Sequence, residues 1–312
     1  MERKENKQSI IGRWPEIPYA GEKKLPIPEE PTAGSWPTYY LKRDEKGGFL
    51  DPKGRPINLK IKNPKSIDFT GKQLKIVQKT LNNITKEKIK IADYWGTGPA
   101  TKQWTPILDK LIDVYNITAP RAGRMLGAVQ AGLNDAFVVT WYYKYLWAIP
   151  RPNQLDQKLA TVLCTPKHPS YPSGHSVVAG CAQVIISYFF PPKSKIMRRF
   201  AEECSISRLY AGVHYPVDND EGFRLGKQIG KIIVADLKRQ KDSTHTRIDR
   251  YIKTNKKVKL PPPPYEQVLP FLGETKCRSL LIDRNIDRKK SKGKYQLFLL
   301  FLLLLLFLSN DS

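Results

Sequence analysis

The sequence predicts an all-α protein, a helical bundle flanked by irregular, basic segments. Three observations support this fold class. Between Trp104 and Leu237, apolar residues recur at helical spacing in several successive segments. Two of these segments carry stripes of small residues that suit close helix packing. No segment of this region shows the alternation that is typical of a half-buried strand, and 312 residues suffice for a sizeable core.

Four regions are expected along the chain. Residues 1–65 form an irregular N-terminal arm, because prolines recur there among charges and Asp51-Pro52-Lys53-Gly54 is typical of a turn. Residues 66–240 form the helical domain that carries the chemistry, 241–296 a basic, proline-containing extension, and 297–312 an apolar tail. Within the extension, Pro261–Pro264 is interpreted as a linker, and a ligand for a proline-binding partner is the alternative.

The helices are expected in the following order. One begins within residues 71–90, a second covers Trp104–Ile117, and a third runs from Pro120, which suits a first helical turn, to about Leu146. Three more cover Val177–Phe190, Lys195–Tyr210 and Asp218–Leu237. The last has glycine at every fourth position, namely Gly222, Gly226 and Gly230. Because cationic residues interleave with them, close packing in a soluble bundle is favoured over a membrane dimer.

Charge is unevenly distributed along the chain. Lys and Arg number 53 against 29 Asp and Glu, a formal net charge of +24. Ile91–Leu237 holds 16 basic and 11 acidic residues, so most of the excess lies in the flanks. Such flanks indicate solubility or loose attraction to anionic surfaces. No zinc-finger spacing or RNA-binding aromatic signature occurs, so no nucleic acid partner is expected. A homodimer and peripheral membrane contact stay open.

The cysteines and the two termini bear on the compartment. Cys164, Cys181, Cys204 and Cys277 form no C-x-x-C pair, which argues against a zinc site and a disulfide framework. Buried thiols in a reducing compartment are the interpretation. Residues 1–14 lack an apolar signal region, so no signal peptide and a cytoplasmic protein are expected. The apolar run Leu297–Leu308 is shorter than the roughly 20 residues of a spanning helix. It is interpreted as a dispensable tail, and a tail anchor or peripheral membrane segment is the alternative.

The candidate site is organised around Pro172-Ser173-Gly174-His175. Pro172 disfavours helix before it, and Ser173 is a good N-cap for the helix that follows. The free N–H groups and positive dipole end of that helix would suit a tetrahedral oxyanion. Gly174 lets the backbone approach the anion closely, and His175 can exchange a proton near neutral pH.

Two further stretches supply cations and a second histidine. Lys144 and Arg151 lie at a helix end and in the following turn, where lysine offers a point charge and arginine a planar fork. Arg208 precedes His214 by six residues, and Asp218 follows His214 by four. A carboxylate there can accept the imidazole Nδ1–H, which leaves Nε2 free as a nucleophile or ligand. Solvated cations and a core histidine satisfied by a nearby aspartate are the alternatives for each stretch alone.

Together the three stretches resemble the signature of the type 2 phosphatidic acid phosphatase and vanadium haloperoxidase superfamily. That signature is K-x6-R-P, then P-S-G-H, then S-R-x5-H-x3-D, and the resemblance covers roughly residues 91–237. All its fixed positions are present in order: Lys144, Arg151, Pro152, Pro172, Ser173, Gly174, His175, Ser207, Arg208, His214 and Asp218.

The resemblance implies a helical bundle with one anion pocket. The groups that would hold the oxygens of phosphate or vanadate are Lys144, Arg151, Arg208, Ser173 and the Gly174 N–H. His214 would be the apical group, forming a phosphohistidine or binding vanadium. Asp218 would orient His214, and His175 would be the acid–base group.

Several details resemble the haloperoxidase branch. Asp135-Ala136 and Trp141 precede Lys144 as in that branch, and Ile91–Trp95 resembles its upstream Tyr/Phe-Trp stretch. His168 stands where chloroperoxidases usually have Phe and bromoperoxidases His. The resemblance therefore implies a vanadate-dependent enzyme that oxidises bromide or iodide with hydrogen peroxide, with Trp141 and His168 as contacts to halide or substrate.

Two other functions stay open. A soluble phosphatase would hydrolyse phosphomonoesters through a phosphohistidine at His214 and would need no cofactor. An integral lipid phosphatase is disfavoured, because the predicted helical region has no apolar run long enough to span a bilayer. A non-enzymatic basic protein would bind anionic surfaces, and the retention of both His175 and His214 argues against it.

Overall fold

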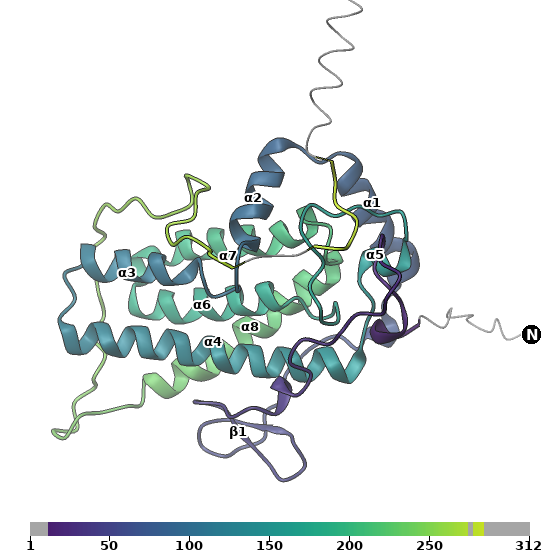
Figure 1. Cartoon of the computed structure of the whole chain (residues 1–312). Helices are drawn as coiled ribbons and strands as arrows, with labels where there is room; N and C mark the ends of the chain where they lie inside the picture. Colours follow the sequence, from purple (N-terminus) through teal and green to yellow (C-terminus); the bar gives the residue numbers. More distant parts are fainter. Residues whose placement is uncertain (1–11, 274–276, 284–312) are drawn as a thin grey trace, which may run out of the picture. The chain divides into compact units, whose positions relative to one another are not determined.

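Helices make up most of residues 69–237 in the computed structural model, which describes residues 12–273 and 277–283 (Figure 1). The α-helices are α1 (Leu74–Asn82), α2 (Lys86–Gly96), α3 (Trp104–Val114), α4 (Ala119–Trp147), α5 (Pro152–Leu155), α6 (Gly174–Phe189), α7 (Ser194–Tyr210) and α8 (Pro216–Leu237). Shorter helical turns are η1 (Trp14–Glu16), η2 (Ala33–Ser35), η3 (Pro64–Ser66), the π-helical η4 (Phe69–Gln73) and η5 (Pro191–Lys193). In the described residues, the strands are the antiparallel pair β1 (Lys42–Arg43) and β2 (Phe49–Leu50), with Lys42 opposite Leu50. The all-α class is confirmed.

Local signals account for the ends of the helices. The segment 71–90, expected to begin one helix, contributes to two, because Thr85 caps α2 by accepting the Lys88 N–H (3.3 Å). α3 ends at Val114, three residues before the predicted end, and Asn116 follows in a left-handed conformation (φ 55°). α4 ends at Trp147, and Ala148 follows it, also in a left-handed conformation (φ 48°). The remaining predicted helices agree with α6, α7 and α8 to within three residues at each end.

α6 is the centre of the bundle. It packs against α4, α7 and α8, and Figure 1 shows it among these helices. Most of its residues are buried, because apolar side chains occur on every side of it. Its N-terminus therefore lies inside the fold. There the Ser173 N–H donates to the Asp218 carbonyl of α8 (3.0 Å).

The glycine ladder of α8 brings that helix unusually close to α6. A Cβ added at Gly222 would lie 2.7 Å from the Ser173 carbonyl oxygen, and one at Gly226 would overlap the Val177 carbonyl. Only a residue without a side chain leaves room for this backbone-to-backbone approach. The predicted packing role of the ladder is confirmed.

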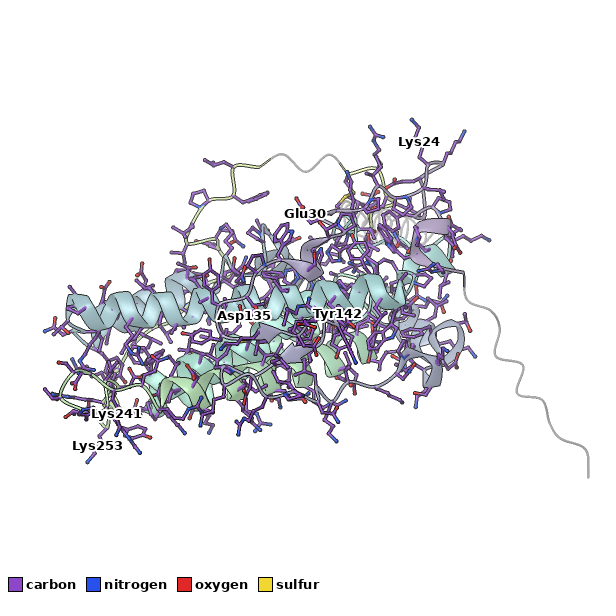
Figure 2. All side chains as sticks on the ribbon, turned by 90° about the horizontal axis from the view of Figure 1, so that it is seen from below. Lys24, Glu30, Asp135, Tyr142, Lys241 and Lys253 are labelled. Carbon is purple, nitrogen blue, oxygen red and sulfur yellow. A yellow bond between two sulfur atoms is a disulfide. The ribbon has the colours of Figure 1, made fainter. Side chains whose placement is uncertain are left out.

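A buried carboxylate of α4, that of Asp135, binds three backbone N–H groups of the N-terminal arm. Asp135 Oδ1 accepts the Tyr39 N–H (2.8 Å), and Oδ2 accepts the N–H groups of Tyr40 (2.8 Å) and Leu41 (2.9 Å). Figure 2 shows Asp135 on this long helix. The arm is thus irregular, as expected, but its backbone is fixed through specific donors rather than by regular structure.

The segment after α8 returns along the bundle through side-chain contacts. Asp249 pairs with Arg124 of α4 (2.7 Å), and the Tyr265 hydroxyl donates to Glu203 of α7 (2.9 Å). Between them, residues 261–262 are buried. Pro261–Pro264 therefore begins packed against the fold and ends exposed, and its interpretation as a linker stays a prediction.

Cys164 and Cys277 form a disulfide, with Cα atoms 5.4 Å apart. The bond joins the loop before α6 to the C-terminal segment across 113 residues of sequence. The expectation of no disulfide is wrong for this pair, because the two cysteines meet only in the folded chain. Cys181 and Cys204 are buried thiols, as expected. Disulfides persist in oxidising compartments, so the cysteines no longer support a reducing one.

Membrane contact was expected, if at all, from the apolar tail. Within residues 12–273 and 277–283, no helix has both the length and the apolar character needed to cross a bilayer. The run Leu297–Leu308 lies outside the described residues.

Candidate active site

The signature residues come from separate elements and meet near the N-terminus of α6. Lys144 lies in the last turn of α4, Arg151 caps α5, and Arg208 lies in the last turn of α7. His214 lies in the loop before α8, and Asp218 in the first turn of α8. The three cations are at most 2% exposed, so their charges act in a medium that screens them weakly.

His214 is held through both ring nitrogens. Nδ1 lies 2.9 Å from Asp218 Oδ2, and Nε2 lies 3.0 Å from Arg151 Nη1. Because arginine can only donate, Nε2 is the acceptor and Nδ1 carries the proton. Burial lowers the pKa of His214 well below its ordinary value, and the charges of Arg151 and Lys144 act in the same direction. The ring is therefore neutral, with its Nε2 lone pair directed at the cations.

Asp218 is fixed by more than its histidine. Oδ2 also accepts the Ser170 hydroxyl (2.5 Å) and the Tyr215 N–H (3.1 Å). Burial raises the pKa of Asp218 to about 6, against the opposing effects of the Ser170 hydrogen bond and the Lys144 charge. Sequence reasoning missed Ser170. Its position three residues before Ser173 was the available signal, but a serine in a proline-rich loop is too common to stand out.

Backbone carbonyls of the loop before α6 position two of the cations. Lys144 Nζ donates to the carbonyls of Pro169 (2.6 Å) and Ser170 (2.8 Å). Arg151 Nε donates to the His168 carbonyl (3.0 Å). Burial lowers the pKa of Lys144 well below its usual range. Carbonyl oxygens orient these side chains without supplying a counter-charge, so a bound anion would stabilise their protonated forms.

Arg208 and His175 each have a buried nitrogen without a hydrogen-bond partner, Nε in Arg208 and Nε2 in His175. Burial lowers the pKa of Arg208 to about 10. Burial also lowers the pKa of His175 well below its usual value, and the Arg208 and Arg151 charges act with it. His175 is therefore a neutral imidazole that can accept a proton. Unpartnered buried groups of this kind are uncommon in folded proteins and mark a place for a ligand.

The first turn of α6 faces the same cations. Ser173 occupies the N-cap position, as predicted, but its hydroxyl makes no capping bond and instead accepts from Ser176 (3.1 Å). A Cβ added at Gly174 would lie 3.6 Å from the Trp141 ring and 4.0 Å from Lys144 Cε. The free N–H groups of this turn thus lie beside a buried positive charge, which favours an anion.

Trp141 and His168 form a ring pair next to Arg151. Their ring centroids are 4.7 Å apart, and His168 Nδ1 lies 3.0 Å from Arg151 Nη2. Burial lowers the pKa of His168 well below its usual value. The Trp141 indole N–H also donates to the Glu29 carbonyl of the N-terminal arm (3.3 Å). The N-terminal arm therefore contacts a residue beside the site, and no sequence pattern predicted this contact.

The donor set suits a tetrahedral oxyanion. Three buried cations, a helix N-terminus and the His214 lone pair converge, and the unpartnered Arg208 Nε can donate to an oxygen of such an anion. Among the residues described, no cluster of three or more His, Cys, Asp or Glu side chains could hold a metal cation. Phosphate and vanadate both fit these residues.

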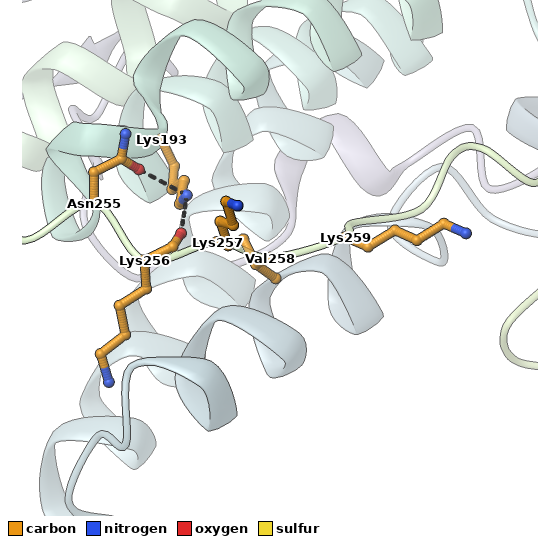
Figure 3. Close-up of a pocket in the computed structure, with 6 residues that line it drawn as sticks. All are labelled: Lys193, Asn255, Lys256, Lys257, Val258 and Lys259. Carbon is orange, nitrogen blue, oxygen red and sulfur yellow. Dashed lines mark hydrogen bonds between the residues drawn. The ribbon is translucent and has the colours of Figure 1, made fainter.

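A lysine-lined groove is a separate feature. Figure 3 shows the residues that line its volume of about 570 Å³: Lys193, Asn255, Lys256, Lys257, Val258 and Lys259. Lys193 Nζ donates to Asn255 Oδ1 (2.8 Å), which ties the extension to the start of α7. No predicted site residue lines this groove. It belongs to the basic flank and not to the site at α6.

Comparison with known proteins agrees with this geometry. Residues 125–242 match the model of the PAP2 superfamily. A vanadium-dependent bromoperoxidase of Corallina officinalis is 32% identical over 92 residues, which is 21% of this chain and 15% of that protein. Among solved structures, a bacterial vanadium-dependent iodoperoxidase has a TM-score of 0.56 at 23% identity, covering 72% of this chain and 60% of that one. A holo-type bacterial vanadium-dependent chloroperoxidase has a TM-score of 0.55 at 13% identity, covering 70% and 58%.

These matches show a shared fold, and a similarity to the superfamily over residues 125–242. The chain spans less than two thirds of each of these relatives, and the identities to the solved structures are too low to report more than a shared fold. The matched residues 125–242 include Lys144, His175 and His214. Residues 125–242 are therefore similar to the PAP2 superfamily, and the chain has the helical fold of the vanadium haloperoxidases.

Proposed function

We propose that the chain is a vanadate-dependent haloperoxidase-like enzyme that oxidises bromide or iodide with hydrogen peroxide. The observation that carries the proposal is the His214 Nε2 lone pair, directed at Arg151 within a buried cluster of three cations. Similarity to a bromoperoxidase over 92 residues, and a fold shared with an iodoperoxidase, support this reaction class.

Each residue of the site has a defined task in this reaction. His214 Nε2 would hold the vanadate, and Lys144, Arg151 and Arg208 would balance the charge of its oxygens. When bound, vanadate supplies the Lewis-acidic centre that activates hydrogen peroxide toward halide. Neutral His175 accepts a proton from the incoming peroxide. Overall, halide, hydrogen peroxide and one proton give hypohalous acid and water.

Trp141 and His168 are the proposed contacts to the halide. The His168 ring lies between the indole and the Arg151 guanidinium, so this wall combines a polarisable surface with a nearby positive charge. Bromide and iodide are large, polarisable anions that such a wall would favour. The proposed preference for bromide or iodide therefore rests on the Trp141 and His168 rings and not on the cations that would hold the oxyanion.

A phosphatase is the alternative, favoured by the match of residues 125–242 to a superfamily that includes phosphatases. The His214 Nε2 lone pair would attack phosphorus. His175, once protonated beside the negative charge of the bound phosphoester, would give that proton to the leaving ester oxygen. Water would then hydrolyse the phosphohistidine and release phosphate. No cofactor takes part in this reaction.

Paired assays on one purified preparation test the proposal. One assay supplies p-nitrophenyl phosphate without vanadate, and the other supplies orthovanadate, hydrogen peroxide and bromide with a brominatable dye. We expect bromination that requires vanadate, is inhibited by phosphate, and is lost in His214→Ala. Release of nitrophenol that vanadate blocks, without bromination, would establish the phosphatase instead. Absence of both activities would contradict an enzyme of either class.

A further inference from the structure

The α2 C-terminal turn, Trp95–Gly96, forms a wall against the guanidinium of Arg208. A Cβ added at Gly96 would lie 2.9 Å from each of the two terminal nitrogens of Arg208 and would overlap Leu163 Cδ1. No side chain fits at Gly96 unless both the Leu163 side chain and the guanidinium move. α2 contacts α7, the helix that carries Arg208, and Figure 1 shows the two helices adjacent.

Glycine is required at position 96 by the lack of room for a side chain and not by the backbone conformation. It is absent from the glycines with positive φ, so an alanine there would meet no conformational penalty. Glycine at the end of a helix usually serves a left-handed cap. Here its missing side chain makes room for a cation of the candidate site.

Specific bonds hold the turn in place. The Trp95 indole N–H donates to Glu203 Oε1 of α7 (2.9 Å), and the Tyr265 hydroxyl donates to Glu203 Oε2 (2.9 Å). The Tyr94 carbonyl accepts from Gln103 (2.7 Å) and also from Gln267 (2.8 Å). α7, α3 and the C-terminal extension therefore all fix the backbone on which Gly96 lies.

The turn also lies beside the acid–base histidine, because the backbone of Trp95 hydrogen-bonds to His175. The other nitrogen of that ring, Nε2, is unpartnered. One short segment of α2 thus borders both the anion-binding Arg208 and the proposed proton acceptor.

We propose that Gly96 is a positioning residue that sets the place of the Arg208 guanidinium, and that Glu203 locks the turn that carries it. The proposal rests on the oxyanion site of the proposed function. It does not depend on whether vanadate or phosphate is the natural occupant, because Arg208 would meet the oxygens of either.

A double-mutant cycle with a binding readout tests the proposal. Affinity for orthovanadate and for phosphate is measured by calorimetry on the full chain, for wild type, Gly96→Ala, Arg208→Ala and the double variant. We expect Gly96→Ala to weaken binding at least tenfold. In the Arg208→Ala background the same substitution should change affinity less than twofold, because no guanidinium is left to displace.

Gly123→Ala is the matched control. Gly123 lies in α4, and a Cβ there would meet nothing within 4 Å, so affinity should equal that of wild type. If Gly96→Ala does not fold, as judged by circular dichroism, Glu203→Gln takes its place in the same cycle, with weaker binding that again disappears beside Arg208→Ala.

The outcomes separate this inference from the proposed function. Wild-type affinity in the Gly96 and Glu203 variants, or a penalty that persists without Arg208, would overturn the positioning role alone. A wild-type chain that binds neither anion would overturn the oxyanion site, and the positioning role with it. Binding of phosphate without any peroxidase activity would leave the positioning role intact and remove only the peroxidase.

Discussion

The helical bundle and the two flanks packed on it support the candidate site by different means. In the bundle, side chains on the helices or at their ends supply the cations, the histidines and Asp218. In the flanks, single groups supply the support: the Glu29 carbonyl on Trp141, Tyr265 on Glu203, and Cys277 bonded to Cys164. The family resemblance covers roughly residues 91–237 and leaves the flanks out, yet each flank contacts a residue that borders the site.

This difference teaches where sequence patterns carry information. Side-chain directions repeat along a helix with a fixed period. The turn in which Lys144 or Asp218 lies can therefore be inferred from the spacing of residues in the sequence. An irregular segment has no period, and its place depends on pairs of groups far apart in sequence. We therefore expect substitutions of site residues in the bundle to abolish turnover. Substitutions that release the flanks should mainly lower the free energy of unfolding.

The largest effect is expected from Asp218→Asn in the bundle. The amide oxygen cannot accept from the Nδ1–H, the Ser170 hydroxyl and the Tyr215 N–H together, as the carboxylate does. The tautomer that directs the Nε2 lone pair at Arg151 is therefore lost. By analogy with triad aspartates, turnover should fall by about 10²- to 10⁴-fold with the fold retained. Initial rates of bromination and circular dichroism measure the two quantities.

Asp220→Asn is the control, since Asp220 is an exposed residue of the same helix. Its turnover should match that of wild type. Full activity in Asp218→Asn would show that turnover does not depend on the hydrogen bond between Asp218 and His214.

The second effect is expected from the disulfide. Opening Cys164–Cys277 releases a long loop, so the free energy of unfolding should fall by about 2–4 kcal/mol. Urea denaturation with and without reductant measures it, and reductant should have no effect on a Cys164→Ser/Cys277→Ser variant. A thiol titration of the denatured, unreduced chain should find only Cys181 and Cys204. Four reactive thiols would show that the bond is absent.

A smaller effect is expected from Asp135→Asn on α4. The amide cannot accept from all three N–H groups of residues 39–41, so at least one donor is left without its partner. The cost is about 1–3 kcal/mol, and trypsin should cut faster at Lys42 or Arg43 as the arm loosens. Asp109→Asn, an exposed residue of α3, should be cut at the wild-type rate. Equal cleavage of all three chains would mean that Asp135 does not hold the arm.

The smallest effect expected from any single side chain is on the pH dependence of the free energy of unfolding. Burial lowers the pKa of His168, His175 and His214 in the folded chain, so each stays neutral where the unfolded chain binds a proton. As pH falls through about 6.5, the free energy of unfolding should fall by about 1.4 kcal/mol per pH unit for each such proton. Asp218, whose pKa is raised, opposes this trend mainly below about pH 6.

Urea denaturation between pH 7.5 and 6 is therefore the test window. Substitution of His245, which lies exposed in a loop, should leave the slope unchanged. A free energy of unfolding that stays constant across this window would mean that the buried histidines are not held neutral.

Much of the fold and site could be predicted, for physical reasons. Helix ends and motif residues follow from local rules, so α6 begins where the Ser173 cap predicted it. Ser170, the disulfide and the Glu203 bonds could not be predicted, because nothing local distinguishes them. Their partners are 48, 113 and more than 60 residues away. The disulfide takes the place of two expected free thiols for the same reason.

The central claim is that His214 Nε2 is the atom at which the oxyanion is held. The most direct measurement is a calorimetric titration of orthovanadate into wild type and His214→Ala, with circular dichroism to verify the fold. The account predicts one site per wild-type chain, competition by phosphate, and affinity at least 100-fold weaker in the variant. Equal affinity in the two folded chains would contradict it, because the cations alone would then hold the anion.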